Sequence, residues 1–130
     1  MTFRILCTYE TGNSFNKEQD TDYIPITWEK IEVARDSLRR VAEHYRAFRA
    51  IHTRSYCRSQ EEKAEQDKAL KEASTKEWYV DVYGEIGGSI IIKTDNGKDY
   101  QFWPPWIGYF ERLFTAEIVS DHREDRMVFS

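Results

Sequence analysis

A long amphipathic pattern in the first half of the chain constrains the fold more than any other feature of the sequence. Six residues recur at intervals of three or four and fall in one band of a helical projection: Ala34, Leu38, Val41, Tyr45, Phe48 and His52. Such a band is the buried face of a helix that packs against other elements. The pattern predicts a helix over about 28–56, with Thr27 as its N-cap and Glu29 in its first turn, where the helix dipole favours a negative charge.

A second helix is expected after the first. The segment Ser59-Gln60-Glu61-Glu62 matches a capping box, in which serine and glutamate side chains satisfy the free amides of a first helical turn. The residues from Glu61 to Ala73 favour a helix, but only Leu70 and a few alanines could contribute to a core. We therefore expect a solvated helix within a charged connection at about 59–76, inside a single domain that spans 1–130.

Alternation of apolar and polar residues predicts strands at the start of the chain. Every second residue from Phe3 to Tyr9 is suited to a core, which is typical of a half-buried strand. A polar loop at about 11–22 and a short strand at Tyr23–Thr27 are expected to follow. Because proline donates no backbone hydrogen bond, Pro25 predicts that this short strand lies at the edge of a sheet or ends at a bulge.

The strongest turn signal in the second half of the chain is Asp95-Asn96-Gly97. Asn-Gly between two alternating segments is typical of a β-hairpin, so we expect paired strands at 89–94 and 98–103. A strand at 78–83 precedes them and ends in the glycine-rich turn Gly84–Gly88.

The last part of the chain leaves one assignment open. Residues 106–114 fit a short helix, because Pro105 suits its first turn and the apolar residues share one face, but they also fit a bulged strand. A final strand at 115–120 and a flexible polar tail at 121–130 complete the chain. The sequence therefore predicts an α+β fold: an antiparallel sheet of about five to six strands, with the long helix and the second, charged helix packed on one face.

Composition and charge are those of a cytoplasmic protein without a membrane segment. The chain of 130 residues is 40% apolar and 32% charged, and no apolar run approaches the roughly 18 residues of a membrane span. The N-terminal residues lack the apolar core of a signal peptide. Cys7 and Cys57 are too few for a disulfide framework, so both are expected to be small buried hydrophobes in a reducing compartment.

Positive charge is concentrated on the long helix. Residues 28–58 carry a net charge of +4 from eight basic and four acidic residues, so the remainder carries −8. Four arginines lie beside the apolar band: Arg35, Arg39, Arg46 and Arg49. They could bind phosphate or an acidic protein, or form a solvated face held by ion pairs at helical spacing: Glu32–Arg35, Asp36–Arg40 and Glu43–Arg46. The interleaved acidic residues and the overall charge of −4 favour the solvated face and argue against nucleic acid as a partner.

The sequence contains no recognisable metal or catalytic motif. His44, His52 and His122 lack the spacing of a zinc site, and His52 falls on the apolar band, where a core histidine is typical. Among the carboxylates, Glu85 and Glu111 would be the first to inspect, but a turn residue and an ion-pair partner are the simpler interpretations. We therefore expect no metal and no cofactor, and favour a protein that is not an enzyme.

The stretch Tyr100–Phe114 contains seven of the nineteen aromatic residues of the chain, around Pro104-Pro105. Aromatic side chains have the largest burial energies, so the stretch is expected to form core under the long helix. It could also form a binding surface, in which Trp103, Trp106 and Tyr109 stack on a base or sugar or anchor a protein partner.

Three motifs occur in order along the chain. They are Thr8-Tyr9-Glu10-Thr11-Gly12-Asn13-Ser14-Phe15, then Glu43-His44-Tyr45, then Gln101-Phe102-Trp103 continuing through Pro105-Trp106-Ile107-Gly108-Tyr109-Phe110-Glu111. Together they resemble small accessory proteins encoded by tailed bacteriophages and prophages, over about residues 3–120. The resemblance names no activity. It implies a product that acts in the bacterial cytosol, where such proteins often bind and disable a host or defence protein.

Three functional hypotheses follow from these features. The leading one is a non-enzymatic protein that binds and inhibits a bacterial host or anti-phage defence protein, through Trp103, Trp106, Tyr109, Glu111, Asn13, Ser14, Arg35, Arg39 and Arg46. The alternative is a protein or small enzyme for a nucleotide or nucleotide signal, in which the aromatic stretch 100–114 stacks the base while Asn13, Ser14 and an arginine hold phosphate. The third is a homodimer with the long helix as its seam.

Overall fold

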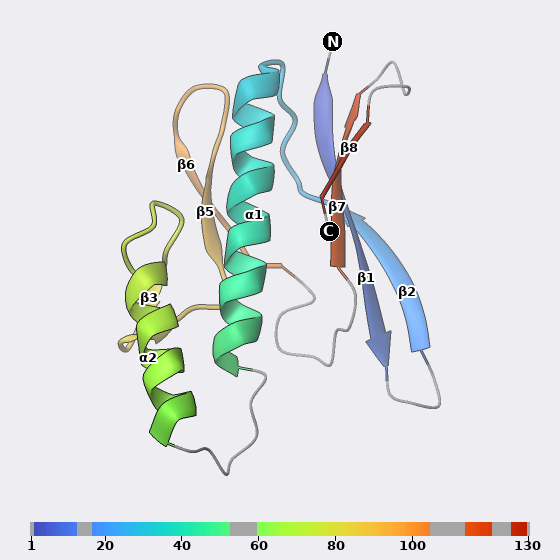
Figure 1. The fold of residues 1–130 in the computed structure, drawn as a ribbon. Coiled ribbons are helices and arrows are strands. Elements are labelled where there is room, and N and C mark those ends of the chain that lie inside the picture. Colours follow the sequence, from blue (N-terminus) through green and yellow to red (C-terminus); the bar gives the residue numbers. More distant parts are fainter. Residues whose placement is uncertain (1, 13–16, 53–59, 105–113, 121–125, 130) are drawn as a thin grey trace.

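The computed structural model of the chain describes residues 2–12, 17–52, 60–104, 114–120 and 126–129. Within these ranges the fold is α+β, with two helices and antiparallel strands. The elements are arranged as in Figure 1, in the order β1 (Phe3–Gly12), β2 (Lys17–Tyr23), α1 (Ile31–His52), α2 (Gln60–Ala73), β3 (Asp81–Val82), β4 (Glu85–Ile86), β5 (Ile90–Lys93), β6 (Asp99–Phe102), β7 (Phe114–Ser120) and β8 (Arg126–Phe129).

The strands that the structure describes form a four-stranded sheet and two hairpins, and so differ from the single sheet of about five to six strands expected from the sequence. The sheet has the order β2-β1-β7-β8, whereas β3–β4 and β5–β6 each pair separately. In Figure 1, α1 stands between the sheet and the β5–β6 hairpin and contacts both. The buried face of α1 is therefore wider than the predicted apolar band. It also includes the polar residues Ser37, Arg40 and His44.

The start of α1 is decided by a contact with the first strand. The helix begins at Ile31 rather than near residue 28, so the prediction of Thr27 as its N-cap is wrong. Trp28 is instead paired with Phe3 in an antiparallel bridge, with backbone hydrogen bonds in both directions. This pairing keeps residue 28 in extended backbone, which a helical turn cannot share.

A side chain from the β5–β6 turn supports the backbone that leads into α1. The carboxylate of Asp95 accepts hydrogen bonds from the amide of Glu29 at 2.7 Å and the amide of Lys30 at 3.3 Å. Asp95 therefore satisfies amides near the helix start that Thr27 was expected to satisfy, although it lies more than sixty residues away in the sequence.

A loop prediction and a strand prediction at the start of the chain are wrong. Residues 11–22, expected to be a loop, fall largely in a hairpin, because β1 continues to Gly12 and β2 covers Lys17–Tyr23. The strand predicted at Tyr23–Thr27 is absent beyond Tyr23. β2 is an edge strand of the sheet, and polar residues are common in edge strands. For this reason its sequence lacks the apolar alternation that marks buried strands.

Of the other predicted elements, the Asn-Gly hairpin, the second helix and the final strand are confirmed, whereas the strand at 78–83 and the C-terminal tail differ from the prediction. The hairpin around Asp95-Asn96-Gly97 is formed by β5 and β6, and Gly97 has the positive φ of +77° that its turn requires. The second helix and the final strand correspond to α2 and β7. The strand expected at 78–83 is reduced to the two residues of β3. At the C-terminus, residues 126–129 of the expected flexible tail form β8, which pairs with β7.

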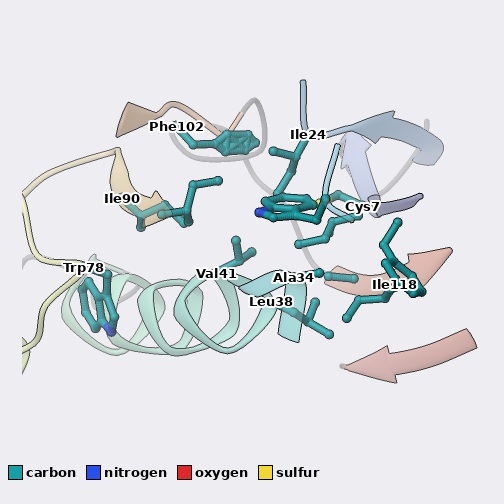
Figure 2. Packing of buried hydrophobic residues seen from close by; sticks show 14 of the residues in the cluster. Cys7, Ile24, Ala34, Leu38, Val41, Trp78, Ile90, Phe102 and Ile118 are labelled. Carbon is teal, nitrogen blue, oxygen red and sulfur yellow. The ribbon is translucent and has the colours of Figure 1, made fainter. Parts of the chain in front are cut away.

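The sheet, the β5–β6 hairpin and α1 contribute side chains to one core. Figure 2 shows this cluster, which includes Cys7, Ile24, Ala34, Leu38, Val41, Trp78, Ile90, Phe102 and Ile118. Burial raises the pKa of the Cys7 thiol to about 12, and the charge of Asp22 adds to this effect. Cys7 is therefore the small buried hydrophobe that the sequence predicts, whereas Cys57 lies outside the described residues.

Candidate functional site

The described part of the aromatic stretch is divided between core and surface. Phe102 and Pro104 are buried, but the side chain between them, Trp103, is 63% exposed. Trp106, Tyr109 and Glu111 lie outside the described residues. Among the described residues of this stretch, Phe102 therefore belongs to the core and Trp103 is the exposed aromatic side chain.

Two further residues assigned to the site from the sequence, Asn13 and Ser14, also lie outside the described residues. The predicted arginines Arg35, Arg39 and Arg46 all lie on α1. The sequence assigned these arginines and Trp103 to one contact surface. The geometry instead ties Arg39 to a network of carboxylates.

Arg39 is held by three carboxylates of its own chain. Its guanidinium donates to Asp36 at 2.8 Å, to Glu43 at 2.9 Å, and to Glu77, which follows α2. The hydrogen bonds with Glu77 and Asp36 raise the pKa of Arg39, and the bond from Arg39 lowers the pKa of Glu77. The donors of Arg39 are thus directed to its own chain, as expected for the solvated face with internal ion pairs.

Arg40, next to it, confirms one predicted ion pair. Its Nε donates to Asp36 at 2.7 Å, and another guanidinium nitrogen lies 3.3 Å from the carbonyl oxygen of Ile91 in β5. The contact with Ile91 joins α1 to the β5–β6 hairpin. Because the Arg40 side chain is buried, it does not face the surface, where a ligand would bind.

The segment after α2 is attached to α1 through Trp78. The indole is almost fully buried, and its Nε1 donates to Oε1 of Glu43 at 3.1 Å. Burial opposes ionisation of Glu43, but the hydrogen bonds from Trp78 and Arg39 outweigh it and lower the pKa of the carboxyl. The backbone of Trp78 also accepts a hydrogen bond from the amide of Ile91, which joins the segment to β5.

A buried histidine makes a second attachment to α1. The ring of His44 is 1% exposed, and its Nε2 lies 2.8 Å from the carbonyl oxygen of Gly87. Because a carbonyl oxygen only accepts, Nε2 carries the proton of this bond. The ring also packs edge-on against Trp78 and stacks on Phe48, with centroids 5.5 and 5.8 Å apart. The sequence predicted a core histidine at His52 and did not identify His44.

Gly87 closes the β3–β4 hairpin at its base. Its amide donates to the carbonyl oxygen of Val80 at 3.1 Å, on the other side of the hairpin. A Cβ at this position would lie 3.0 Å from Val82 Cγ2 and 3.1 Å from the Val80 oxygen, so a larger residue would push the two sides apart. The base of the hairpin is therefore closed by backbone contact and fixed to α1 by His44.

The tip of this hairpin carries a fully exposed aromatic side chain. Tyr83 and Gly84 connect β3 and β4, and both have positive φ, +52° and +79°, which is typical of a type I′ turn. Tyr83 is 100% exposed, and Val82 beside it is 38% exposed. Asp81 and Glu85 flank the turn and are exposed as well. The sequence predicted Glu85 as a turn residue and Tyr83 as a strand residue, but Glu85 lies in β4 and Tyr83 lies in the turn.

A groove of about 340 Å³ lies between α1 and the end of α2. Its wall contains Trp78 and alanines of both helices, and its charged lining includes Glu43, Arg46, Glu72 and Lys76. Among the residues that the structure describes, no group of three or more His, Cys, Asp or Glu side chains is placed to hold a metal ion. Neither described helix has the length and hydropathy of a membrane span.

Comparison of the chain with protein-family models, with curated proteins and with solved structures found no match.

Proposed function

We propose that this chain is a non-enzymatic binding protein whose partner is a bacterial protein, and that it inhibits a host or anti-phage defence protein in the bacterial cytosol. The observation that carries the proposal is the exposure of Trp103 between two buried neighbours, Phe102 and Pro104. The inhibitory role rests on the resemblance of the sequence motifs to phage accessory proteins.

An exposed tryptophan on ordered backbone suits a protein contact for two reasons. Its large apolar surface gains free energy when a partner removes it from water, and tryptophan is enriched among the residues that dominate binding energy. Trp103 also follows β6 directly, and the pairing of Phe102 with Ile90 orders the backbone before it. A side chain on ordered backbone loses less entropy on binding.

A nucleotide or nucleotide signal is the second candidate, because an exposed indole also stacks on a base. Among the residues that the structure describes, the exposed indole of Trp103 is the feature that supports a nucleotide ligand. Arg39 adds little to this alternative, since its donors already contact Asp36, Glu43 and Glu77. The protein-binding function is therefore the better supported of the two.

The test is affinity capture from a bacterial lysate with the wild-type chain and Trp103→Ala, with identification of captured proteins by mass spectrometry. Tyr23→Ala is the matched control, because Tyr23 is a partly exposed aromatic residue in β2, outside the aromatic stretch. We expect one stoichiometric protein in the wild-type and Tyr23→Ala samples, and its loss with Trp103→Ala. The captured protein is then purified for an affinity measurement and an activity assay.

Two results would contradict the proposal. Capture of no protein by the folded wild-type chain would remove the protein partner. Quenching of tryptophan fluorescence by a nucleotide, absent in Trp103→Phe, would favour the nucleotide function instead.

A further inference from the structure

We propose that the β3–β4 hairpin is a second contact element, which inserts Tyr83 into an apolar cleft of the partner protein whose rim carries lysine and arginine side chains. The inference rests on the proposed function, since it specifies the chemistry of the partner. It follows from the exposure of the hairpin tip, the rigidity of its base and the charge of its flanks.

The exposure of Tyr83 is not explained by the turn that contains it. A type I′ turn favours Asn, Asp or Gly at its first central position, because these residues adopt positive φ with little strain. Tyr83 has φ +52° there, which is strained for a residue with a bulky side chain. Its ring is fully exposed and contributes nothing to the core. The turn would be more stable with glycine, so the tyrosine fits a role outside the folded chain.

The base of the hairpin is fixed although its strands have only two residues each. Trp78 before β3 is buried and bonded to Glu43, and Gly87 after β4 is bonded to the buried ring of His44. Both attachments are to α1, at adjacent positions of the helix. The tip is therefore presented by a short, closed hairpin with two anchored ends, and little entropy is lost when a partner binds it.

The flanks of the tip are acidic. Asp81 and Glu85 are exposed on either side of the turn, and no ion pair with a cation is formed by either carboxylate among the residues that the structure describes. Asp81 accepts a hydrogen bond from the hydroxyl of Tyr79 at 3.3 Å, which leaves its negative charge unneutralised. An exposed aromatic ring, with an exposed carboxylate two residues before it and another two residues after it, complements an apolar pocket with a cationic rim.

This charge also selects among classes of partner. Nucleic acid and phosphate ligands would be repelled by Asp81 and Glu85. A second copy of this chain is a competing occupant, because its residues 28–58 carry a net charge of +4. The ion pairs of Arg39 and Arg40 neutralise part of that surface within each copy, which favours a different protein as the source of the cationic cleft.

The experiment compares three variants in binding to the protein captured by the wild-type chain, expressed and purified separately. Tyr83→Gly removes the ring and relieves the strained φ, and Asp81→Asn/Glu85→Gln removes both charges. Glu61→Gln/Glu65→Gln is the control, since it removes two exposed charges from α2. Dissociation constants are measured by calorimetry at low and high salt, and melting temperatures by circular dichroism.

We expect Tyr83→Gly to weaken binding by about 30-fold or more while its melting temperature rises. The neutral Asp81→Asn/Glu85→Gln pair should weaken binding by about tenfold at low salt and reduce its salt dependence. The α2 control should leave both properties unchanged. A photo-crosslinker introduced at position 83 should attach to the captured protein beside lysine or arginine residues.

Four results would overturn the inference. The first is an unchanged dissociation constant for Tyr83→Gly, and the second is crosslinking to a surface without cationic side chains. If binding requires Trp103 but not Tyr83, the proposed function stands and this inference fails. If the wild-type chain captures nothing but sediments as a dimer that Tyr83→Gly dissociates, a second copy occupies the tip, and both proposals fail.

Discussion

The two hairpins that follow α2 reach stability in different ways. The β5–β6 hairpin buries Ile90, Ile92 and Phe102, and its Asn96-Gly97 turn has the residues that a tight turn favours. The β3–β4 hairpin buries Ile86 alone from its two strands and places a tyrosine where glycine or asparagine fits better.

The difference shows what each hairpin requires from its surroundings. Burial of an apolar face is non-directional, so β5–β6 is held by many contacts with α1 and the core. β3–β4 depends on a few directional hydrogen bonds, mainly those from His44 and Trp78. A hairpin of the second kind can carry an exposed side chain such as Tyr83, because its stability does not require that side chain to be buried.

The largest effect is expected from Ile92→Ala in β5. Ile92 is fully buried, so its truncation removes apolar contacts and leaves a cavity, with a loss of about 2–5 kcal/mol in the free energy of unfolding. Urea denaturation followed by circular dichroism measures this loss. Ile91→Ala, in the same strand but only half-buried, should lose clearly less. Equal losses would show that β5 is not held mainly by burial.

A smaller and more local effect is expected at His44. His44→Ala removes the ring and leaves the Gly87 carbonyl oxygen without its donor, at about 2–3 kcal/mol. His44→Phe keeps most of the packing and should lose about 1–2 kcal/mol. Hydrogen exchange should show faster opening at the Gly87 amide in both variants, with β5 amides less affected. Uniform acceleration across both hairpins would mean that His44 supports the whole core instead.

The smallest effect concerns pH. The pKa values of Glu43 and Glu77 are lowered in the folded chain from an ordinary value of 4.5. The stability that each contributes is therefore present above pH 4.5 and is lost as the pH falls through the lower folded value. Because Arg39 and Glu77 are well exposed, we expect less than about 1 kcal/mol from their pair. Arg39→Gln should flatten the acid side of a stability-against-pH curve, and an unchanged slope would contradict this.

The sequence indicated Trp103 as a candidate surface residue, but it indicated neither the exposure of Tyr83 nor the burial of His44. The reason for this difference is geometrical. An excess of aromatic residues in a short stretch indicates that some will reach the surface. For Tyr83, the alternation of residues 78–83 predicts a strand, but the chain turns at Tyr83 because Gly87 returns to pair with Val80. For His44, burial depends on the approach of Gly87, which helical periodicity does not encode.

Local patterns by themselves determined α1, α2, the β5–β6 hairpin and the first and last core strands, because helical periodicity, alternation and Asn-Gly turns act over a few residues. Only the tertiary structure decided where α1 begins, since that depends on the pairing of Trp28 with Phe3 and on the carboxylate of Asp95. It also decided the division of the described strands into one sheet and two hairpins, and the burial of His44. These features arise from contacts between residues far apart in the chain, and no local pattern encodes such contacts.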